Sequence, residues 1–281
     1  MSAEGDTASF DRGSRVVHPP GTLLQHLYVK ERLAGVAPGS FVEVGVGSGH
    51  LSNLLLRNGW SGTGYDLSAG ALARAARLNA PFIERGRFAV RRGDWLAEAE
   101  SAPADLVVSS MVIEHLDEDG VARYFEQARS TLRSSGRGVV LVPGSPRHWG
   151  IEDEIAGHYR RYTADSLSAT VRRHDLRVLH LAGLTYPLSN MLLRLSNALV
   201  SRAERQKRLL SLQQRTERSG ERDVAWKTEF PPWAGALLNE TTLRPFHWLQ
   251  RRCSGYPGAL VLYCEFSSAL TPRTAQRTRG G

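Results

Sequence analysis

A strand that runs directly into three alternating glycines constrains this chain more than any other feature. Residues 42–50 read V-E-V-G-V-G-S-G-H, with glycine at Gly45, Gly47 and Gly49. Glycine serves where the backbone must turn sharply with positive φ, and it lets a ligand approach the main chain closely. The segment therefore predicts a strand, a tight ligand-binding turn, and a helix that begins near residue 50.

The rest of the chain alternates between apolar strand-like segments and amphipathic helical segments. Strands are expected at 40–45, 62–66, 87–91, 105–110, 138–143, 176–182 and 259–266, and helices after Pro20 and at 50–58, 68–79, 118–133 and 163–174. This alternation is typical of an α/β fold, a doubly wound and mostly parallel sheet with helices on both faces. Ligands of such sheets bind beyond the carboxyl ends of the strands.

The alternation is interrupted once, and this interruption sets the expected organisation of the chain. We divide the sequence into a disordered N-terminal arm (1–19), a core (20–185), a helical cap or insertion (186–257), a final core strand (258–267) and a disordered basic tail (268–281). Within the cap, 188–210 is predicted to be a long amphipathic helix with a basic end, and a second helix is expected around 243–250.

Composition excludes several classes of protein but does not select a partner. Cys253 and Cys264 match no disulfide or metal spacing, and no apolar run reaches the length of a membrane span. The N-terminal residues lack the apolar core of a signal peptide, so we expect a cytoplasmic protein. The net charge of +8 is compatible with nucleic acid, an anionic membrane or an acidic small molecule, and general solubility also accounts for it.

Acidic side chains stand at the ends of three successive predicted strands. Glu43 lies just before the glycine turn, Asp66 ends the second strand, and Asp94 follows the third beside Trp95. A carboxylate at Asp66 can accept both hydroxyls of a ribose, and Asp94 with an indole suits an adenine. Because Glu43 would repel a phosphate but attract a cation, these residues predict a ligand with ribose, adenine and a cationic end, as in S-adenosylmethionine.

The order of these motifs resembles class I S-adenosylmethionine-dependent methyltransferases. The similar segments are E-V-G-V-G-S-G, G-Y-D-L-S, R-G-D-W and D-L-V-V-S-S-M-V-I-E-H-L-D, and the E-H pair resembles the small-molecule and quinone-type branch. The resemblance implies a seven-stranded Rossmann-like sheet whose last strand is antiparallel and inserted beside the sixth. It implies S-adenosylmethionine as cofactor and S-adenosylhomocysteine as product. The implied cofactor-binding residues are Glu43, Gly45, Gly47, Gly49, Asp66, Leu67, Asp94, Trp95 and Ser110.

The residues expected at the acceptor lie after the fourth and fifth strands. His115, in I-E-H-L-D, is a candidate base, and the alternative is that Glu114 and His115 only shape the turn. No acidic triplet of metal-binding type accompanies these motifs, so we expect no metal. Asp117 and Asp119 keep a magnesium-dependent enzyme open as an alternative.

A charged stretch, I-E-D-E-I-A-G-H-Y-R-R-Y-T, follows the fifth strand and is expected as a structured loop over the acceptor. It resembles a recurring feature of natural-product methyltransferases. We predict His158 as a second catalytic residue and Trp149, Tyr159, Arg160 and Arg161 as substrate-binding residues. The alternative is an internal network in which Asp153 or Glu154 pairs with one of the two arginines, which would then bind no anion.

These features predict a methyltransferase that acts on a small anionic or apolar organic acceptor. Methylation of oxygen or nitrogen is the first expectation, and methylation of carbon stays open. Natural-product biosynthesis is the expected setting, and the chain is expected to be a monomer or homodimer without nucleic acid. Three alternatives stand: an RNA methyltransferase, favoured only by charge; an enzyme for a lipid or prenyl acceptor at the membrane surface; and a catalytically silent cofactor-binding partner.

Overall fold

Seven strands form one sheet in the order β3-β2-β1-β4-β5-β7-β6, in a computed structural model that describes residues 17–98, 102–193 and 230–268. The strands are β1 (Ser40–Val44), β2 (Ser61–Asp66), β3 (Phe88–Arg92), β4 (Ala104–Ser110), β5 (Leu132–Pro143), β6 (Leu176–Leu184) and β7 (Val261–Ser268). The first five pair in parallel, whereas β7 is antiparallel to both β5 and β6. The predicted topology, with the last strand inserted beside the sixth, is confirmed.

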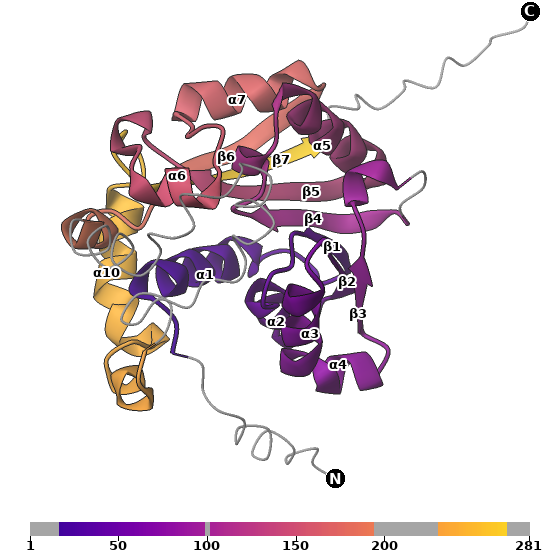
Figure 1. Ribbon diagram of the computed structural model, residues 1–281, viewed down its shortest axis with the longest axis horizontal. Coiled ribbons are helices and arrows are strands. Elements are labelled where there is room, and N and C mark those ends of the chain that lie inside the picture. The colour runs from indigo at the N-terminus through magenta and orange to yellow at the C-terminus, as the bar shows by residue number, and fades with distance from the viewer. Residues whose placement is uncertain (1–16, 99–101, 194–229, 269–281) are drawn as a thin grey trace, which may run out of the picture.

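Helices cover both faces of this sheet (Figure 1). The α-helices are α1 (Pro20–Leu33), α2 (His50–Arg57), α3 (Ala69–Leu78), α4 (Ala80–Glu84), α5 (Glu118–Thr131), α6 (Ile151–Ala156), α7 (Ala164–Arg173) and α10 (Glu240–Arg252). Short 3-10 helices are η1 (Trp95–Ala97), η2 (Ile113–His115), η3 (Pro146–His148) and η5 (Pro232–Ala236). In Figure 1, α5 and α7 lie above the sheet, and α1, α2 and α3 lie below it.

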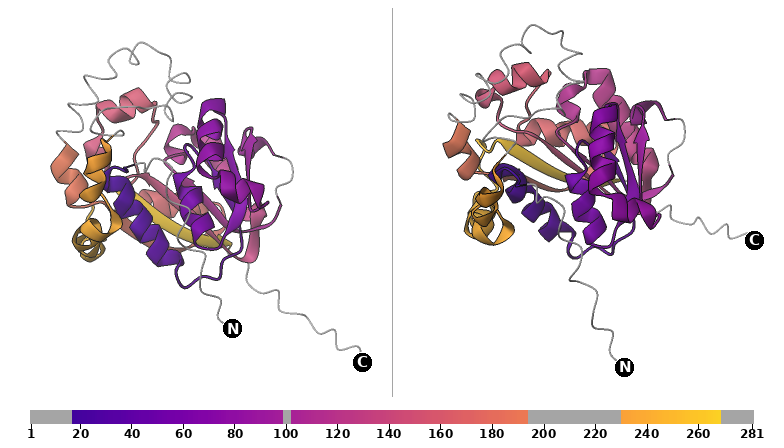
Figure 2. Two further views of the ribbon diagram at one scale, coloured as in Figure 1. Left: turned by 90° about the horizontal axis from the view of Figure 1, so that it is seen from below. Right: turned by 60° about the horizontal axis from the view of Figure 1, so that its bottom comes forward.

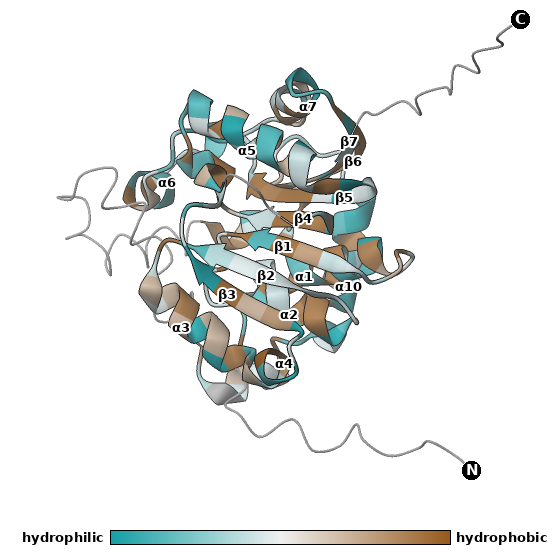
Figure 3. Ribbon diagram, turned by 90° about the vertical axis from the view of Figure 1, so that its right-hand side faces the viewer, coloured by the Kyte–Doolittle hydropathy of each residue, from teal (hydrophilic) through white to brown (hydrophobic). Residues whose placement is uncertain are grey.

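Alternation along the strands builds a separate apolar core on each face. On β4, Val107 faces the core shared with α5 and α7, and Leu106 and Val108 face the core shared with α1, α2 and α3. Successive side chains of a strand point to opposite faces, so a central strand that is covered on both sides is apolar throughout. Figure 3 shows this contrast, with brown central strands and teal stretches on the helices.

The predicted cap is described only in part. Residues 188–193 are helical. The remainder of the expected long helix, 194–210, falls within 194–229, which lies outside the described residues, as do 1–16 of the arm and 269–281 of the tail. The helix α10 packs against α1, where Gln250 donates to the carbonyl of Leu24 (2.9 Å) and accepts from the amide of Thr185 (2.9 Å). Figure 2 shows α10 beside α1 in both views. This part of the segment is therefore bound to the core.

A buried ion-pair network connects the last strand to the rest of the sheet. Glu265 of β7 is fully buried and binds Arg32 of α1 (2.6 Å) and Arg137 of β5. Each arginine reaches the carboxylate from a different element, so β7 is attached by charge as well as by backbone pairing.

No helix in the described ranges has the length and apolar character needed to cross a membrane.

Two local predictions were wrong in extent. The helix expected over 118–133 ends at Thr131, and β5 begins at Leu132, six residues before the predicted strand. Leu132 pairs with Ala104 across an irregularity in the β4–β5 ladder. A polar stretch such as R-S-S-G-R carries no strand pattern of its own, and its pairing with β4 decides its conformation.

Candidate functional site

The glycine turn has the positive φ angles that its sequence predicts. Gly45, Gly47 and Gly49 all have positive φ, at 71°, 53° and 78°. A Cβ on Gly45 would lie 2.5 Å from Cγ2 of Val112, whereas a Cβ on Gly47 would meet nothing within 4 Å. Glycine at Gly45 thus lets the segment after β4 pack against the turn. At Gly47 the backbone borders open space, where a ligand can reach it.

Asp66, at the carboxyl end of β2, bridges the turn to the start of α3. Its Oδ2 accepts from the amide of Gly47 (2.9 Å) and its Oδ1 from the amide of Ser68 (2.9 Å). Each carboxylate oxygen retains a further lone pair for a ligand hydroxyl. The neighbouring Leu67 is 60% exposed, an apolar side chain beside the predicted ribose position. The structure thus brings Gly47, Asp66 and Leu67 together.

Glu43 does not face the ligand as predicted. Its side chain is buried on the α2 side of the sheet, where the hydroxyl of Ser52 donates to Oε2. Burial raises the pKa of Glu43 to about 8, so the group is protonated at pH 7. The expected attraction of a cationic ligand by this carboxylate is corrected to an internal hydrogen bond that holds α2 on β1.

The structure places the two residues at the end of β3 apart. Asp94 is exposed, and its Oδ1 caps η1 by accepting from the amide of Leu96 (3.0 Å). Trp95 is 1% exposed and packs edge-on against Tyr124 at 5.9 Å between ring centroids. The prediction that its indole offers a face to adenine is corrected, because the turn at η1 directs the ring into the core. Asp94 remains a predicted adenine contact.

The backbone leaves β4 and β5 in a strained conformation. Met111, directly after the predicted cofactor residue Ser110, and Ser145, after β5, both have φ of 57°. Non-glycine residues adopt this conformation at a cost, and such strain gathers at functional sites. Ser110 itself is half-buried at the end of β4. Two adjacent strand ends therefore carry sharp turns at the edge where Glu114 and His158 lie.

Three side chains meet beyond these turns. Glu114 and His115 belong to η2, and His158 follows α6. The rings of His115 and His158 lie 4.7 Å apart, and Nε2 of His158 is 3.9 Å from Oε1 of Glu114. Glu114 is 0% exposed, and burial raises its pKa to about 8, with the charge of Asp153 acting in the same direction. Both predicted catalytic histidines therefore lie in one cluster. The sequence analysis did not predict Glu114 as a third member of it.

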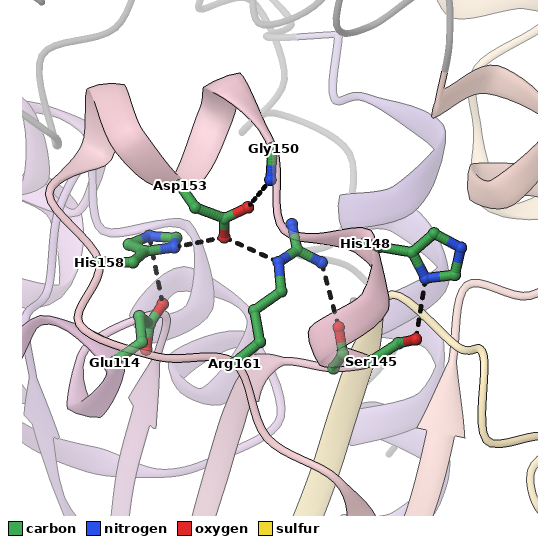
Figure 4. Close-up of polar contacts among 8 residues, drawn as sticks. Glu114, Ser145, His148, Gly150, Asp153, His158 and Arg161 are labelled. Carbon is green, nitrogen blue, oxygen red and sulfur yellow. Dashed lines mark hydrogen bonds and ion pairs between the residues drawn. The ribbon is translucent and has the colours of Figure 1, made fainter.

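Asp153 is the centre of the hydrogen bonds that hold this cluster (Figure 4). It is fully buried and accepts from the amide of Gly150 (2.9 Å), Nδ1 of His158 (2.8 Å) and Nε of Arg161 (2.8 Å). Burial acts to raise the pKa of Asp153, but the hydrogen bonds from His158 and Arg161 hold it below its ordinary value. Asp153 is therefore charged, and it sets the orientation of the His158 ring.

The arginine pair forms the internal network that was weighed as the alternative. Besides Asp153, Arg161 binds the carbonyl of Gly144 (3.0 Å). Arg160 binds Glu118 and the carbonyl of Leu116 (3.0 Å). Both guanidinium groups are engaged by the chain itself, so the prediction that they bind the substrate is corrected. Trp149 and Tyr159 are 43% and 49% exposed and remain predicted acceptor contacts.

The stretch expected as a loop contains a short helix, α6. Its first turn is acidic, Asp153 reaches back to the amide of Gly150, and Gly157 ends it with φ of 75°. Acidic groups near a helix N-terminus and a glycine with positive φ after its last turn both stabilise helices. These signals stand in the sequence. Six residues are too few for the apolar periodicity that identifies longer helices.

Comparison with known proteins identifies the family of this chain. The profile of the family described as methyltransferase domain matches residues 22–181, more than half of the chain. The chain belongs to the methyltransferase domain family. The prediction of a class I S-adenosylmethionine-dependent methyltransferase, and hence of an enzyme, is confirmed at the level of family and fold. No curated protein matches this methyltransferase significantly.

Solved structures share its fold. A candidate sarcosine dimethylglycine methyltransferase from Galdieria sulphuraria is 13% identical, with a TM-score of 0.57 over 88% of this chain and 86% of that one. The pyocyanin biosynthetic protein PhzM is 24% identical (TM-score 0.48, 58% of this chain and 52% of that one). The glycopeptide N-methyltransferase MtfA complexed with S-adenosylmethionine is 21% identical (TM-score 0.46, 56% and 79%). The match thus spans about half the length of PhzM.

Proposed function

We propose that this methyltransferase transfers the methyl group of S-adenosylmethionine to a hydroxyl oxygen of a small organic acceptor. S-adenosylmethionine is the cofactor. The open backbone at Gly47 and the carboxylate of Asp66 receive its amino-acid and ribose parts. The exposed Leu67 follows Asp66 at the end of β2, and the exposed Asp94 lies beyond β3; both contact the adenine.

One contact carries the proposal. Val112 packs against Gly45 of the cofactor turn, and Glu114 and His115 follow two and three residues after Val112. The polar cluster therefore begins two residues after the side chain that contacts the cofactor turn. Methyl transfer is an in-line displacement, so an acceptor held at the cluster has its nucleophile beside the methyl group.

The nature of the cluster favours oxygen over nitrogen. A hydroxyl must lose its proton before it attacks a sulfonium, whereas a neutral amine carries a nucleophilic lone pair already. Two imidazoles and a carboxyl group, with the ring of His158 held by Asp153, are suited to take that proton or to hold the resulting anion. His115 and His158 thus act on the acceptor, and Trp149 and Tyr159 border it with their exposed rings.

The test follows the methyl group. The full chain is incubated with S-adenosylmethionine labelled in the methyl group, together with either total tRNA or a panel of phenols, alcohols, carboxylic acids and amines. We expect label in the phenol or alcohol fraction and stoichiometric S-adenosylhomocysteine. Label in tRNA would establish the RNA alternative, for which only the net charge of +8 speaks. Cofactor binding by calorimetry without turnover on any acceptor would favour a silent binding partner.

A further inference from the structure

The cluster beyond β4 has the composition and spacing of a metal site. Glu114, His115 and His158 each offer one ligand atom, and these atoms all lie within 4.8 Å of one another. Donors around a tetrahedral metal with bonds of about 2.05 Å are about 3.4 Å apart. The pair formed by Nε2 of His158 and Oε1 of Glu114, at 3.9 Å, is already close to that value. Small side-chain rotations would bring all three donors around one ion.

The carboxyl group of Glu114 supplies a second and independent observation. It is 0% exposed, no hydrogen bond from another described residue reaches either of its oxygens, and Nε2 of His158 lies 3.9 Å from Oε1. Buried polar atoms nearly always have a hydrogen-bond partner, and a buried carboxyl group that lacks one is disfavoured. The guanidinium of Arg161 is bound to Asp153 and to Gly144 instead. A cation between the three donors would give the ionised carboxyl group of Glu114 its partner.

The hydrogen bonds around His158 complete the pattern. Asp153 accepts from Nδ1 of His158 (2.8 Å), and this hydrogen bond places a proton on Nδ1. The lone pair is then on Nε2, the atom that faces Glu114 (Figure 4). A carboxylate that fixes the tautomer of a histidine from behind is the usual arrangement in protein metal sites. Gly150 and Arg161 in turn hold Asp153 in place.

We propose that Glu114, His115 and His158 bind one divalent transition-metal cation, which holds the oxygen of the methyl acceptor. Two imidazoles and one carboxylate suit zinc, iron, cobalt or manganese better than magnesium or calcium, which prefer oxygen ligands. Three protein ligands leave a coordination position for the acceptor. The role in catalysis rests on the function proposed above, with the two imidazoles acting through the ion instead of as bases, whereas the binding of the ion does not rest on that function.

The chemistry balances without any further reagent. The acceptor hydroxyl coordinates the cation and loses its proton to water, because the positive charge lowers the pKa of a bound hydroxyl. A lone pair of the bound oxygen forms the new O–C bond while the S–C bond breaks. The electron pair of that bond stays on sulfur, and neutral S-adenosylhomocysteine leaves. The proposal replaces the sequence-based expectation of a metal-free site.

Binding of the metal alone tests the site. The full chain is stripped with a chelator, dialysed, and titrated with Co²⁺ without cofactor or acceptor, followed by visible absorption of bound Co²⁺ and by calorimetric competition with Zn²⁺. We expect one Co²⁺ per chain. Glu114→Gln and His158→Gln should each weaken binding at least about a hundredfold, and Asp153→Asn about tenfold to a hundredfold, as for groups that orient a ligand.

His148→Gln is the matched control. His148 is a half-buried histidine on the same loop that bonds to Ser145 (2.9 Å) and lies outside the cluster. It should leave Co²⁺ affinity unchanged, and thermal unfolding checks that every variant folds. Equal affinity of wild type and Glu114→Gln, or an equal loss in His148→Gln, would overturn the site. Methyl transfer that persists in chelator would refute the catalytic role of the ion but not the methyltransferase function. Co²⁺ binding without cofactor binding would refute the proposed function and leave only the metal site.

Discussion

Replacing Asp66 with alanine removes the group that connects the cofactor turn to the ribose position. Its two oxygens accept from the amides of Gly47 and Ser68, each at 2.9 Å, and each oxygen keeps a lone pair for one ribose hydroxyl. A hydrogen bond to a charged group contributes about 1.5 kcal/mol at the lower end of the measured range. Loss of two such bonds to the cofactor predicts about 3 kcal/mol, or roughly a hundredfold in affinity.

Competition with water reduces this expected loss of cofactor affinity. Asp66 is only half-buried, so solvent competes for its oxygens before the cofactor binds and can replace them for the ribose in the variant. We therefore expect the affinity for S-adenosylmethionine and for S-adenosylhomocysteine to fall by about tenfold to a hundredfold. Isothermal calorimetry with each ligand measures the loss directly.

Two controls separate binding from folding. Asp119→Ala removes an exposed aspartate from the first turn of α5 and should leave the affinity unchanged. Thermal unfolding of Asp66→Ala without ligand reports how much the lost bond to the turn costs the fold. An affinity within twofold of wild type, in a variant that folds, would refute the assignment of Asp66 to the ribose.

Three further predictions concern stability. Gly47→Ala should cost about 1 kcal/mol in urea unfolding, because Gly47 has φ of 53°, and should also weaken cofactor binding by filling the open space. Glu265→Ala should cost roughly 3 kcal/mol in the same assay, since Arg32 and Arg137 lose their buried partner; a loss below about 1 kcal/mol would contradict this. Burial raises the pKa of Glu43 from 4.5 to about 8, so its folded form keeps a proton that the unfolded chain releases. The associated stability is present below pH 4.5 and lost as pH rises through 8, and Glu43→Gln should flatten the fall in Tm between those values.

The sheet was predictable because its signals are local. The strands β1, β3 and β4 carry apolar runs bounded by turn residues, and the five residues from Gly45 to Gly49 are enough to predict the glycine turn. The inserted position of β7 is different, because strand order is decided by long-range pairing. It was expected only from the resemblance to a known family.

The errors at the site have one physical origin. Whether Glu43 faces a ligand depends on which helix covers that side of the sheet, and the direction of the Trp95 ring depends on the turn at η1; a strand pattern apolar on both faces encodes neither. The pairing of Arg161 with Asp153 instead of a substrate likewise depends on how α6 folds back. Glu114 offered one readable signal, an acidic residue inside the otherwise apolar run M-V-I-E-H-L.

The position of β7 has a consequence for how the protein is made. Ribosomes release the chain from its N-terminus, so β1 to β6 leave the exit tunnel before residues 261–268 are synthesised. Until then β5 and β6 have no strand between them, and Arg32 and Arg137 have no Glu265. The half of the sheet that carries the glycine turn can assemble on the nascent chain, whereas the other half must stay open to admit a strand into its interior. The insertion of β7, which closes the sheet, therefore follows the synthesis of residues 261–268, and a stall before residue 261 leaves two unpaired strand edges for chaperones to shield.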